Sequence, residues 1–209
     1  AEDAAGNLTT KTVSFTIDTT APVVEITGVE DKESYNTTVT PVVTISDATS
    51  QTITLNGATY APGTDVTEEG TYTLVASAED AAGNLTTKTV SFTIDLTAPV
   101  IDITGVTDGG NYMTAVTPVI DIQGATGQPV VTLNGETYAP GTPITADGEY
   151  TLLVTATDEA GNTTTTTITF VIDTVAPEVT VEGVTDGGNY KAPVTPVVTV
   201  SGETSKTIT

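Results

Sequence analysis

The amino-acid sequence predicts an all-β protein made of tandem β-sandwich domains. About a quarter of the 209 residues are Thr, and Val and Ile are frequent, which favours strands. Short runs of alternating apolar and polar residues are separated by turn residues every 8–12 positions, the pattern of a sandwich. One stretch recurs at residues 1–18, 78–95 and 156–173, so the chain repeats every 77 or 78 residues. A period of that size corresponds to one small domain per repeat.

The repeats predict four parts along the chain. Residues 1–18 are the C-terminal part of one repeat, 19–96 and 97–174 are complete repeats, and 175–209 are the N-terminal part of a fourth. Neither end of the chain coincides with a predicted domain boundary, so we expect a segment of a longer polypeptide. The two end parts are the two ends of one domain that lacks only the counterparts of 55–77. Either the array continues through that gap, or chains join head to tail by strand complementation.

The third repeat shows the expected strands most clearly. Its first two strands are separated by a turn at residues 107–112 that contains Gly109 and Gly110. Its next two strands flank Asn134 and Gly135, the strongest short signal for a hairpin. These four strands cover residues 100–106, 117–122, 130–133 and 136–138.

Two long strands then follow on either side of a tight turn at residues 158–162. Each long strand has one apolar face, and we expect all pairing to be local and antiparallel. The second strand carries threonines on its other face, which is typical of a solvent-exposed sheet surface. The apolar faces consist of Tyr150, Leu152, Val154 and Ala156 on the first strand and of Ile168, Phe170 and Ile172 on the second; the threonines are Thr165, Thr167 and Thr169.

The composition excludes several classes of function. The chain has no Cys or His, so we expect no disulfides, no transition-metal site and no Ser–His or Cys–His nucleophile. Five Lys and no Arg stand against 27 acidic residues, a net charge of −22. Phosphate contacts need cationic side chains, so nucleic-acid binding is not expected. No apolar run approaches the length of a membrane span, so we expect no direct membrane insertion. Because the residue types for nucleophilic catalysis are missing, we also expect no enzymatic activity.

The sequence resembles the bacterial immunoglobulin-like tandem repeats of large surface proteins, adhesins and S-layer-associated proteins. The resemblance is carried by residues 148–152, by Ala-Thr-Asp-Glu-Ala-Gly-Asn at 156–162, and by Ile-Asp-Thr-Val-Ala-Pro at 172–177. The turn is also similar to that of hyalin-type repeats. The resemblance implies seven-stranded immunoglobulin-like sandwiches in an extended array, located outside the cell, at its surface or secreted. Tyr72 and Tyr150 lie where such a domain has a tyrosine corner, or they are simply core aromatics.

Acidic residues gather on the turns and linkers that this topology places at domain junctions. Calcium prefers oxygen ligands from carboxylates, amides and backbone carbonyls, so one hypothesis is a calcium ion at each junction. The alternative is that these side chains make Asx-type turn hydrogen bonds and that the other acids are solvated. The candidate ligands are Asp18, Asp31, Asp80, Asn84, Asp95, Asp108, Asp147, Asp158, Asn162 and Asp173.

The most direct functional expectation is a non-enzymatic spacer in a long extracellular surface protein, such as a stalk, surface layer or filament. Its partners would be neighbouring repeats of the same chain and other copies in a fibre or surface layer. The alternative is an adhesive module whose loops recognise a glycan or a protein. Because the loops repeat almost unchanged, that alternative favours weak multivalent binding over one unique site.

Overall fold

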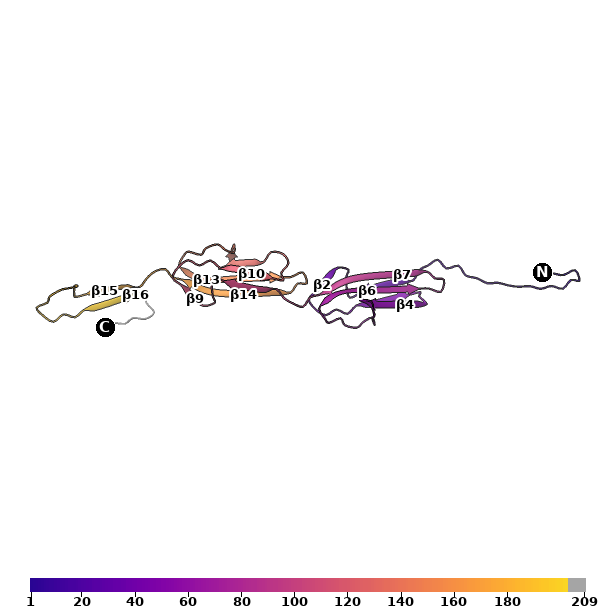
Figure 1. Ribbon diagram of the computed structural model, residues 1–209, viewed down its shortest axis with the longest axis horizontal. Helices are drawn as coiled ribbons and strands as arrows, with labels where there is room; N and C mark the ends of the chain where they lie inside the picture. The colour runs from indigo at the N-terminus through magenta and orange to yellow at the C-terminus, as the bar shows by residue number, and fades with distance from the viewer. Residues whose placement is uncertain (203–209) are drawn as a thin grey trace. The chain divides into compact units, whose positions relative to one another are not determined.

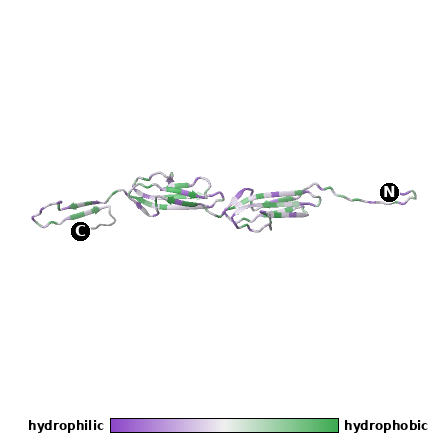
Figure 2. Cartoon of the chain, viewed as in Figure 1, coloured by the Kyte–Doolittle hydropathy of each residue, from purple (hydrophilic) through white to green (hydrophobic). Residues whose placement is uncertain are grey.

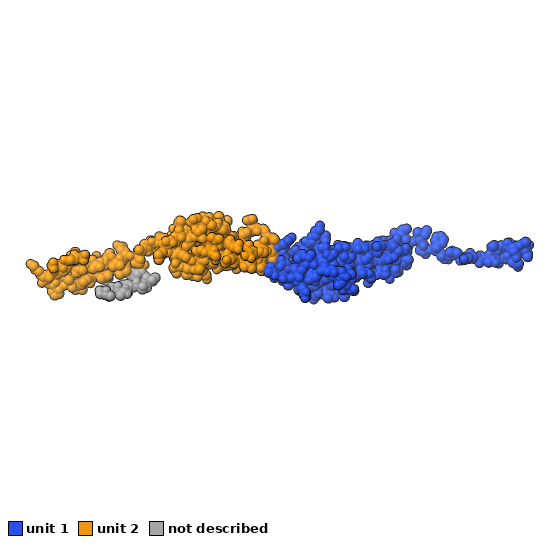
Figure 3. Space-filling view, in the orientation of Figure 1, with its two compact units in different colours: residues 1–97, 159–162 blue, residues 98–158, 163–209 orange. Residues whose placement is uncertain are grey.

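The computed structural model describes residues 1–202, and contacts divide the chain into two compact units (Figure 3). The first unit comprises residues 1–97 with 159–162, and the second comprises residues 98–158 and those from 163 on. All regular elements in the described part are strands. None of residues 1–202 forms a helix long and apolar enough to cross a membrane.

The first unit holds a seven-stranded sandwich (Figure 1). Its larger sheet has five strands in the order β5-β4-β6-β7-β2, and its smaller sheet pairs β1 with β3. Leu74 and Ala76 of β6 and Phe92 and Ile94 of β7 are almost fully buried between the sheets. The strands are β1 (Val23–Thr27), β2 (Glu33–Tyr35), β3 (Val42–Ser46), β4 (Ser50–Leu55), β5 (Ala58–Thr59), β6 (Gly70–Glu79) and β7 (Leu85–Ile94).

The second unit holds a sandwich of the same topology. Its five-stranded sheet has the order β12-β11-β13-β14-β9, and its two-stranded sheet pairs β8 with β10. Leu152, Val154, Phe170 and Ile172 fill its core. The strands are β8 (Val100–Thr104), β9 (Gly110–Tyr112), β10 (Val119–Gln123), β11 (Val130–Leu133), β12 (Glu136–Thr137), β13 (Gly148–Thr157) and β14 (Thr163–Ile172).

The apolar periodicity of the sequence explains both cores. In β14 the buried Ile168, Phe170 and Ile172 follow or alternate with exposed threonines, as predicted. In β13 the predicted apolar face is buried at Leu152, Val154 and Ala156 and half-buried at Tyr150. Hydrophobic residues concentrate on the strands, while the connecting loops are mostly hydrophilic (Figure 2). The all-β sandwich prediction is therefore confirmed.

Tight turns and tyrosines fix the ends of these strands. Asn56 and Asn134 begin the two predicted hairpin turns, and each is in the left-handed region that a type I′ turn requires, with φ of 49° and 52°. The Tyr72 hydroxyl donates to the carbonyl of Glu68 at 2.8 Å, and Tyr150 repeats this contact with a carbonyl four residues upstream. The predicted tyrosine corner is therefore confirmed in both domains.

Two predictions about the early part of each repeat are wrong. Residues 107–112 were expected to form only a turn, but residues 110–112 form β9, which pairs in parallel with β14. The strand β2 pairs in the same way with β7, so the pairing is neither all local nor all antiparallel. A three-residue strand is too short to show an alternating pattern, and its partner lies about 60 residues away in the sequence.

The two end segments carry little regular structure. Residues 1–18 contain no strand, only an isolated bridge between Glu2 and Leu8. After the second sandwich, β15 (Glu178–Glu182) pairs with β16 (Val197–Ser201) in a two-stranded sheet. The predicted fourth repeat at 175–209 extends past the described residues, so its last seven residues lie outside this description. The predicted domain boundaries stay a prediction.

Candidate functional site

The recurring Asp-x-Ala-Gly-Asn turn is built on one carboxylate. Asp80 accepts hydrogen bonds from the backbone N–H of Ala82 at 2.8 Å and of Asn84 at 2.9 Å, both at Oδ1. Its other oxygen accepts from the Asn84 side-chain amide at 2.7 Å. Asp3 and Asn7 make the same set of bonds in the first copy of the motif. The predicted Asx-type turn is therefore confirmed in both copies.

These hydrogen bonds stabilise the charged form of the carboxylate. Asp80 is only 8% exposed, and burial by itself would raise its pKa. The hydrogen bond from the Asn84 side chain, helped by the backbone N–H groups of the turn, instead lowers the pKa of Asp80. The Asn7 side chain lowers the pKa of Asp3 in the same way. In the second copy the turn thus stabilises a nearly buried carboxylate through hydrogen bonds from the Asn84 amide and from backbone N–H groups.

The asparagine of the turn also binds the linker that enters its domain. In the first unit the Asn84 amide nitrogen donates to the carbonyl of Asp18 at 3.0 Å, in addition to its bond with Asp80. Two residues later, the Thr86 hydroxyl donates to the carbonyl of Pro22 at 2.6 Å. One strand end therefore holds the linker at two carbonyls four residues apart.

The second copy of these contacts involves residues 95–99. The Asn162 amide donates to the Asp95 carbonyl at 2.7 Å, a contact within the first unit. Within the second unit, the Thr164 hydroxyl donates to the Pro99 carbonyl at 2.5 Å. The Asn and Thr contacts thus occur at equivalent positions of two successive repeats.

An acid near the start of the sixth strand of each domain holds the outgoing linker. One carboxylate oxygen of Glu69 accepts from the backbone N–H of Leu96 at 2.6 Å and from the hydroxyl of Thr97 at 2.7 Å. In the next repeat, Asp147 accepts from the backbone N–H and the hydroxyl of Thr174, at 3.0 and 2.8 Å. Each outgoing linker therefore has both a polar backbone group and a side chain fixed to the domain that it leaves.

The remaining candidate aspartates also bind nearby backbone groups. Asp31 accepts from the N–H of Ser91, and Asp108 accepts from the N–H and hydroxyl of Thr169. The backbone bond from Thr169, followed by its hydroxyl, lowers the pKa of Asp108. Asp18, Asp95 and Asp173 each accept from the N–H two residues further along the chain.

The candidate ligands lie on turns and linkers, where the calcium hypothesis expects them. The carboxylates described above, however, each accept hydrogen bonds from nearby backbone N–H groups. Asp158 is 7% exposed and occupies the position equivalent to Asp80. Within residues 1–202, no three acidic side chains gather closely enough to form a metal-binding cluster. Calcium binding by these residues stays a prediction.

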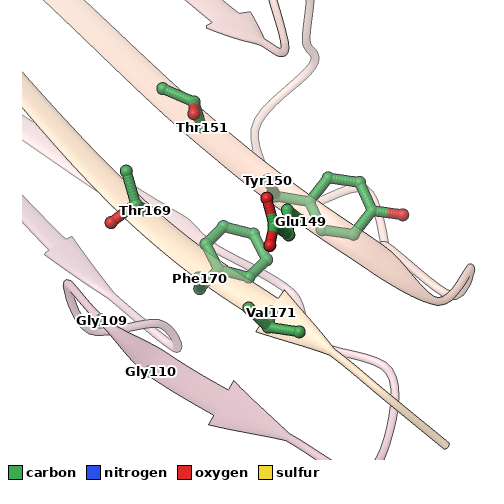
Figure 4. Close-up of a pocket in the computed structure, with 8 residues that line it drawn as sticks. All are labelled: Gly109, Gly110, Glu149, Tyr150, Thr151, Thr169, Phe170 and Val171. Carbon is green, nitrogen blue, oxygen red and sulfur yellow. The ribbon is translucent and has the colours of Figure 1, made fainter.

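A shallow depression of about 280 Å³ lies on the outer face of β13 and β14 beside β9 (Figure 4). Its polar groups are the carboxylate of Glu149 and threonine hydroxyls, and the Thr169 hydroxyl already donates to Asp108. It is formed by a sheet face, whereas the predicted adhesive alternative requires loops. Its lining consists of Gly109, Gly110, Glu149, Tyr150, Thr151, Thr169, Phe170 and Val171.

Sequence reasoning missed several residues that hold these loops. In every copy of the motif a threonine follows the turn asparagine by two positions, and this Asn-x-Thr spacing was the available signal. In two of the copies this threonine, Thr86 or Thr164, donates to a linker carbonyl. Tyr60 and Tyr138 were not singled out either, although both are buried and donate to a backbone carbonyl. Burial raises the pKa of both phenols, and the Asp65 carboxylate adds to this effect at Tyr60.

Comparison with solved structures finds matches at low sequence identity. The fibronectin(III)-like modules of Clostridium thermocellum CbhA are 15% identical, with a TM-score of 0.40, over 72% of this chain and 94% of theirs. The SGBP-B protein of the Bacteroides ovatus mixed-linkage glucan utilization locus, in complex with a heptasaccharide, is 14% identical, with a TM-score of 0.29, over 89% of this chain. A Ca²⁺-stabilized adhesin that helps an Antarctic bacterium bind ice is 28% identical, with a TM-score of 0.31, over 89% of this chain. The chain spans 62% and 59% of the latter two proteins.

Comparison with protein families is more specific. A search of curated proteins found no match. Residues 97–174 match the family model of the bacterial Ig-like domain, and residues 58–132 match that of the bacterial Ig-like domain of group 3. The match at 97–174 coincides with the second sandwich, and the match at 58–132 covers the last strands of the first sandwich and the first strands of the second. Both agree with the resemblance seen in the sequence. The chain therefore carries bacterial Ig-like repeats.

Proposed function

We propose that this chain is a non-enzymatic spacer segment of a long bacterial surface protein. We call the hydrogen bonds that Glu69 and Asn162 make with the linker at 95–99 the linker clamp, and we propose that it keeps successive domains at a fixed angle. Bacterial Ig-like domains are modules of surface proteins, which supports the general role. The finer role, a stiff stalk or filament, rests on one observation. The linker at 95–99 is hydrogen-bonded to protein groups at both of its ends.

The clamp is effective because it binds backbone groups that a flexible linker would expose to water. Glu69 holds Leu96 and Thr97, while Asn162 holds the carbonyl of Asp95. The linker also ends at Pro99, whose ring fixes its own φ and restricts the residue before it. With few free dihedrals left, such a linker behaves as a short strut and not as a random coil.

The repetition of the clamp supports its functional importance. Asp147 replaces Glu69 in the next repeat and accepts from the same two kinds of donor, a backbone N–H and a hydroxyl, both of which belong here to Thr174. A shorter side chain thus makes an equivalent pair of bonds. An array in which every linker carries this clamp would transmit orientation from one domain to the next.

Calcium is a proposed addition to this clamp. The turn and linker aspartates supply oxygen ligands of the kind that calcium prefers. With an affinity of roughly 0.1–1 mM and about 1 mM extracellular calcium, each site would add about 0.4–1.4 kcal/mol. Titration calorimetry of the chain with calcium tests this point. If calcium produces neither heat of binding nor a change in melting temperature, calcium is not part of the clamp.

Rotational diffusion measured by ¹⁵N relaxation tests the spacer proposal. We expect amides of the two complete domains to report one shared, anisotropic rotational diffusion. The double variant Glu69→Ala and Asn162→Ala should shorten the correlation time of both domains, because each can then tumble more independently. The matched control is Asn7→Ala, which changes the same motif where it touches no linker carbonyl. Independent tumbling of the domains in the unchanged chain would refute the proposal.

A further inference from the structure

Two asparagines of the complete domains lie directly before a glycine in a hairpin turn. Asn56-Gly57 connects β4 to β5, and Asn134-Gly135 connects β11 to β12. Both dipeptides are exposed to solvent, and a Cβ added at either glycine would meet no atom within 4 Å. Asparagine is a thermolabile residue, and a following glycine has no side chain to shield its nitrogen. These two turns are therefore where the sequence is most open to spontaneous loss of an amide.

Deamidation of an asparagine before a glycine needs no enzyme. The glycine nitrogen loses its proton and attacks Cγ of the asparagine, the Cγ–Nδ2 bond breaks, and the amide nitrogen leaves as ammonia with that proton. A cyclic imide remains, and water opens it at either carbonyl to give aspartate or isoaspartate. In sum, asparagine and water become an acid and ammonia, with no change of oxidation state. Ring closure requires Cγ to approach the glycine nitrogen in a near-attack geometry.

In the first domain, the side chain of Asn56 is held by strand β6. Strand β4 pairs with β6 as far as Leu55, and the backbone N–H of Asn56 adds one more bond, to the carbonyl of Thr73 at 2.9 Å. The side chain then continues the pairing, since its Oδ1 accepts from the N–H of Thr73 at 2.8 Å and its Nδ2 donates to the carbonyl of Thr71 at 3.2 Å. The amide thus takes the place of a peptide group at the end of the ladder.

The second domain repeats this arrangement with strand β13. Oδ1 of Asn134 accepts from the N–H of Thr151 at 2.8 Å, and its Nδ2 donates to the carbonyl of Glu149 at 3.2 Å. Both ends of each amide are therefore bonded to main-chain groups of a long strand. Turning Cγ toward the glycine nitrogen would break both bonds and leave a donor and an acceptor of that strand without these partners.

We propose that Asn56 and Asn134 are deamidation sites that the folded domain protects, so that deamidation at either turn identifies a domain that has unfolded. In the folded domain the leaving amide is held by β6 or β13, whereas in an unfolded chain it turns freely and reaches the glycine nitrogen. As for proteolysis of a transiently opened state, the rate should then follow the equilibrium population of the open form. The proposal goes beyond the spacer function and does not depend on the linker clamp.

Deamidation also changes the domain that refolds. An aspartate at position 134 still accepts from the N–H of Thr151, but it has no donor for the carbonyl of Glu149, so two acceptors face one another. Isoaspartate instead lengthens the main chain inside a two-residue loop, whose length sets the register of the flanking strands. Because ammonia has been lost, refolding does not reverse either change.

The variant Asn134→Asp reproduces one product and tests the two bonds. We expect the folded-to-unfolded ratio of the second domain to fall by about tenfold, because the Glu149 carbonyl loses its donor. Denaturant unfolding at neutral pH measures this ratio. The control is Gln128→Glu, which makes the same change of amide to carboxylate in an exposed loop of the same domain and should leave the ratio unchanged. An equal loss in both variants, or no loss in Asn134→Asp, would overturn the role given to the two bonds.

Peptide mass spectrometry of the incubated chain tests the protection itself. The chain is kept in mildly alkaline buffer with or without guanidinium chloride, digested, and scored for aspartate and isoaspartate at each asparagine. We expect Asn56 and Asn134 to react at least about tenfold more slowly in the folded chain, because two hydrogen bonds must break first. The matched control is Thr126→Asn, which places an asparagine before Gly127 in an exposed loop outside the strands. That introduced asparagine should react at similar rates with and without denaturant.

Two core variants show whether each site follows its own domain. Phe92→Ala should speed deamidation of Asn56 by about tenfold or more and leave Asn134 unchanged. Phe170→Ala should do the reverse. The comparison holds even if a variant fails to fold, because the other domain then serves as the folded reference. Equal rates in the folded and denatured chain, an introduced asparagine as slow as Asn134, or a core variant that does not speed the asparagine of its own domain would overturn the proposal.

Discussion

The motif occurs with the same sequence at residues 1–18 and 78–95. Comparing the two copies shows which part of the motif forms through local hydrogen bonds and which part needs the packing of a whole domain. The turn is the same in both: Asp3 and Asp80 accept the same bonds, and Gly6 and Gly83 adopt φ of 87° and 89°. The strand that follows is not the same, since residues 85–94 form β7 whereas residues 9–17 form no strand. Side-chain hydrogen bonds within five residues fix the turn, and only tertiary packing fixes the strand.

The largest contrast is expected at the aromatic position of the motif. Phe92→Ala should destabilise the first sandwich by about 3–5 kcal/mol, because it leaves a cavity beside two tyrosine rings. Phe15→Ala should leave the melting temperature unchanged, because that side chain is already in solvent. Thermal unfolding of both variants at low concentration checks this pair. Equal destabilisation would mean that residues 1–18 are packed on a sandwich in solution.

The turn asparagines should show a smaller contrast. Asn84→Ala removes the bonds to Asp80 and to the Asp18 carbonyl, and leaves a nearly buried carboxylate with fewer donors. We expect a loss of about 1–3 kcal/mol in unfolding free energy. Asn7→Ala removes only the bond to the exposed Asp3 and should leave global stability within about 0.5 kcal/mol of the unchanged chain. Denaturant unfolding measures both; a similar loss in the two variants would contradict the role of the linker bond.

The tyrosine corner offers a third comparison, since residues 1–18 lack any counterpart of it. Tyr72→Phe keeps the ring stacked on Phe92 and removes only the hydroxyl bond to the Glu68 carbonyl. The expected loss is about 0.5–1.5 kcal/mol, and Tyr150→Phe should match it in the second domain. An unchanged denaturation midpoint for both variants would show that water replaces the bond at no cost.

The smallest effect concerns protonation of the two turns. The pKa values of both Asp3 and Asp80 are lowered by their asparagines. A carboxyl with a lower pKa in the folded state stabilises that state above its unfolded pKa of about 3.9, and this contribution is lost as pH falls through the folded pKa. Carboxyl ¹³C titration by NMR should therefore find both aspartates below their ordinary range. If the pKa of Asp3 is ordinary while that of Asp80 is lowered, the hydrogen bonds of the turn form only when a complete sandwich supports them.

Local sequence patterns predicted most of this fold. The Asn-Gly hairpins, the alternating long strands and the tyrosine corner are each encoded within about ten residues, and all three are confirmed. The strands β2 and β9 were missed because a parallel pair of three residues depends on a partner far along the chain. The sequence also placed Asp80 and Asn84 opposite Asp18 at a domain junction, but it did not predict the direct bond from the Asn84 amide to the Asp18 backbone carbonyl, 66 residues earlier. Such a contact follows from the topology of the whole domain.

The central claim is that clamped linkers hold neighbouring domains at a fixed angle, and a distance distribution between them tests it most directly. The chain has no Cys, so spin labels can be attached at Ala58→Cys and Glu136→Cys, two exposed and equivalent positions of the two sandwiches. Pulsed electron spin resonance should give one narrow distribution, which broadens in the Glu69→Ala and Asn162→Ala double variant. Adding calcium or a chelator would show whether the ion narrows it further. A broad distribution in the unchanged chain, with and without calcium, would contradict the claim.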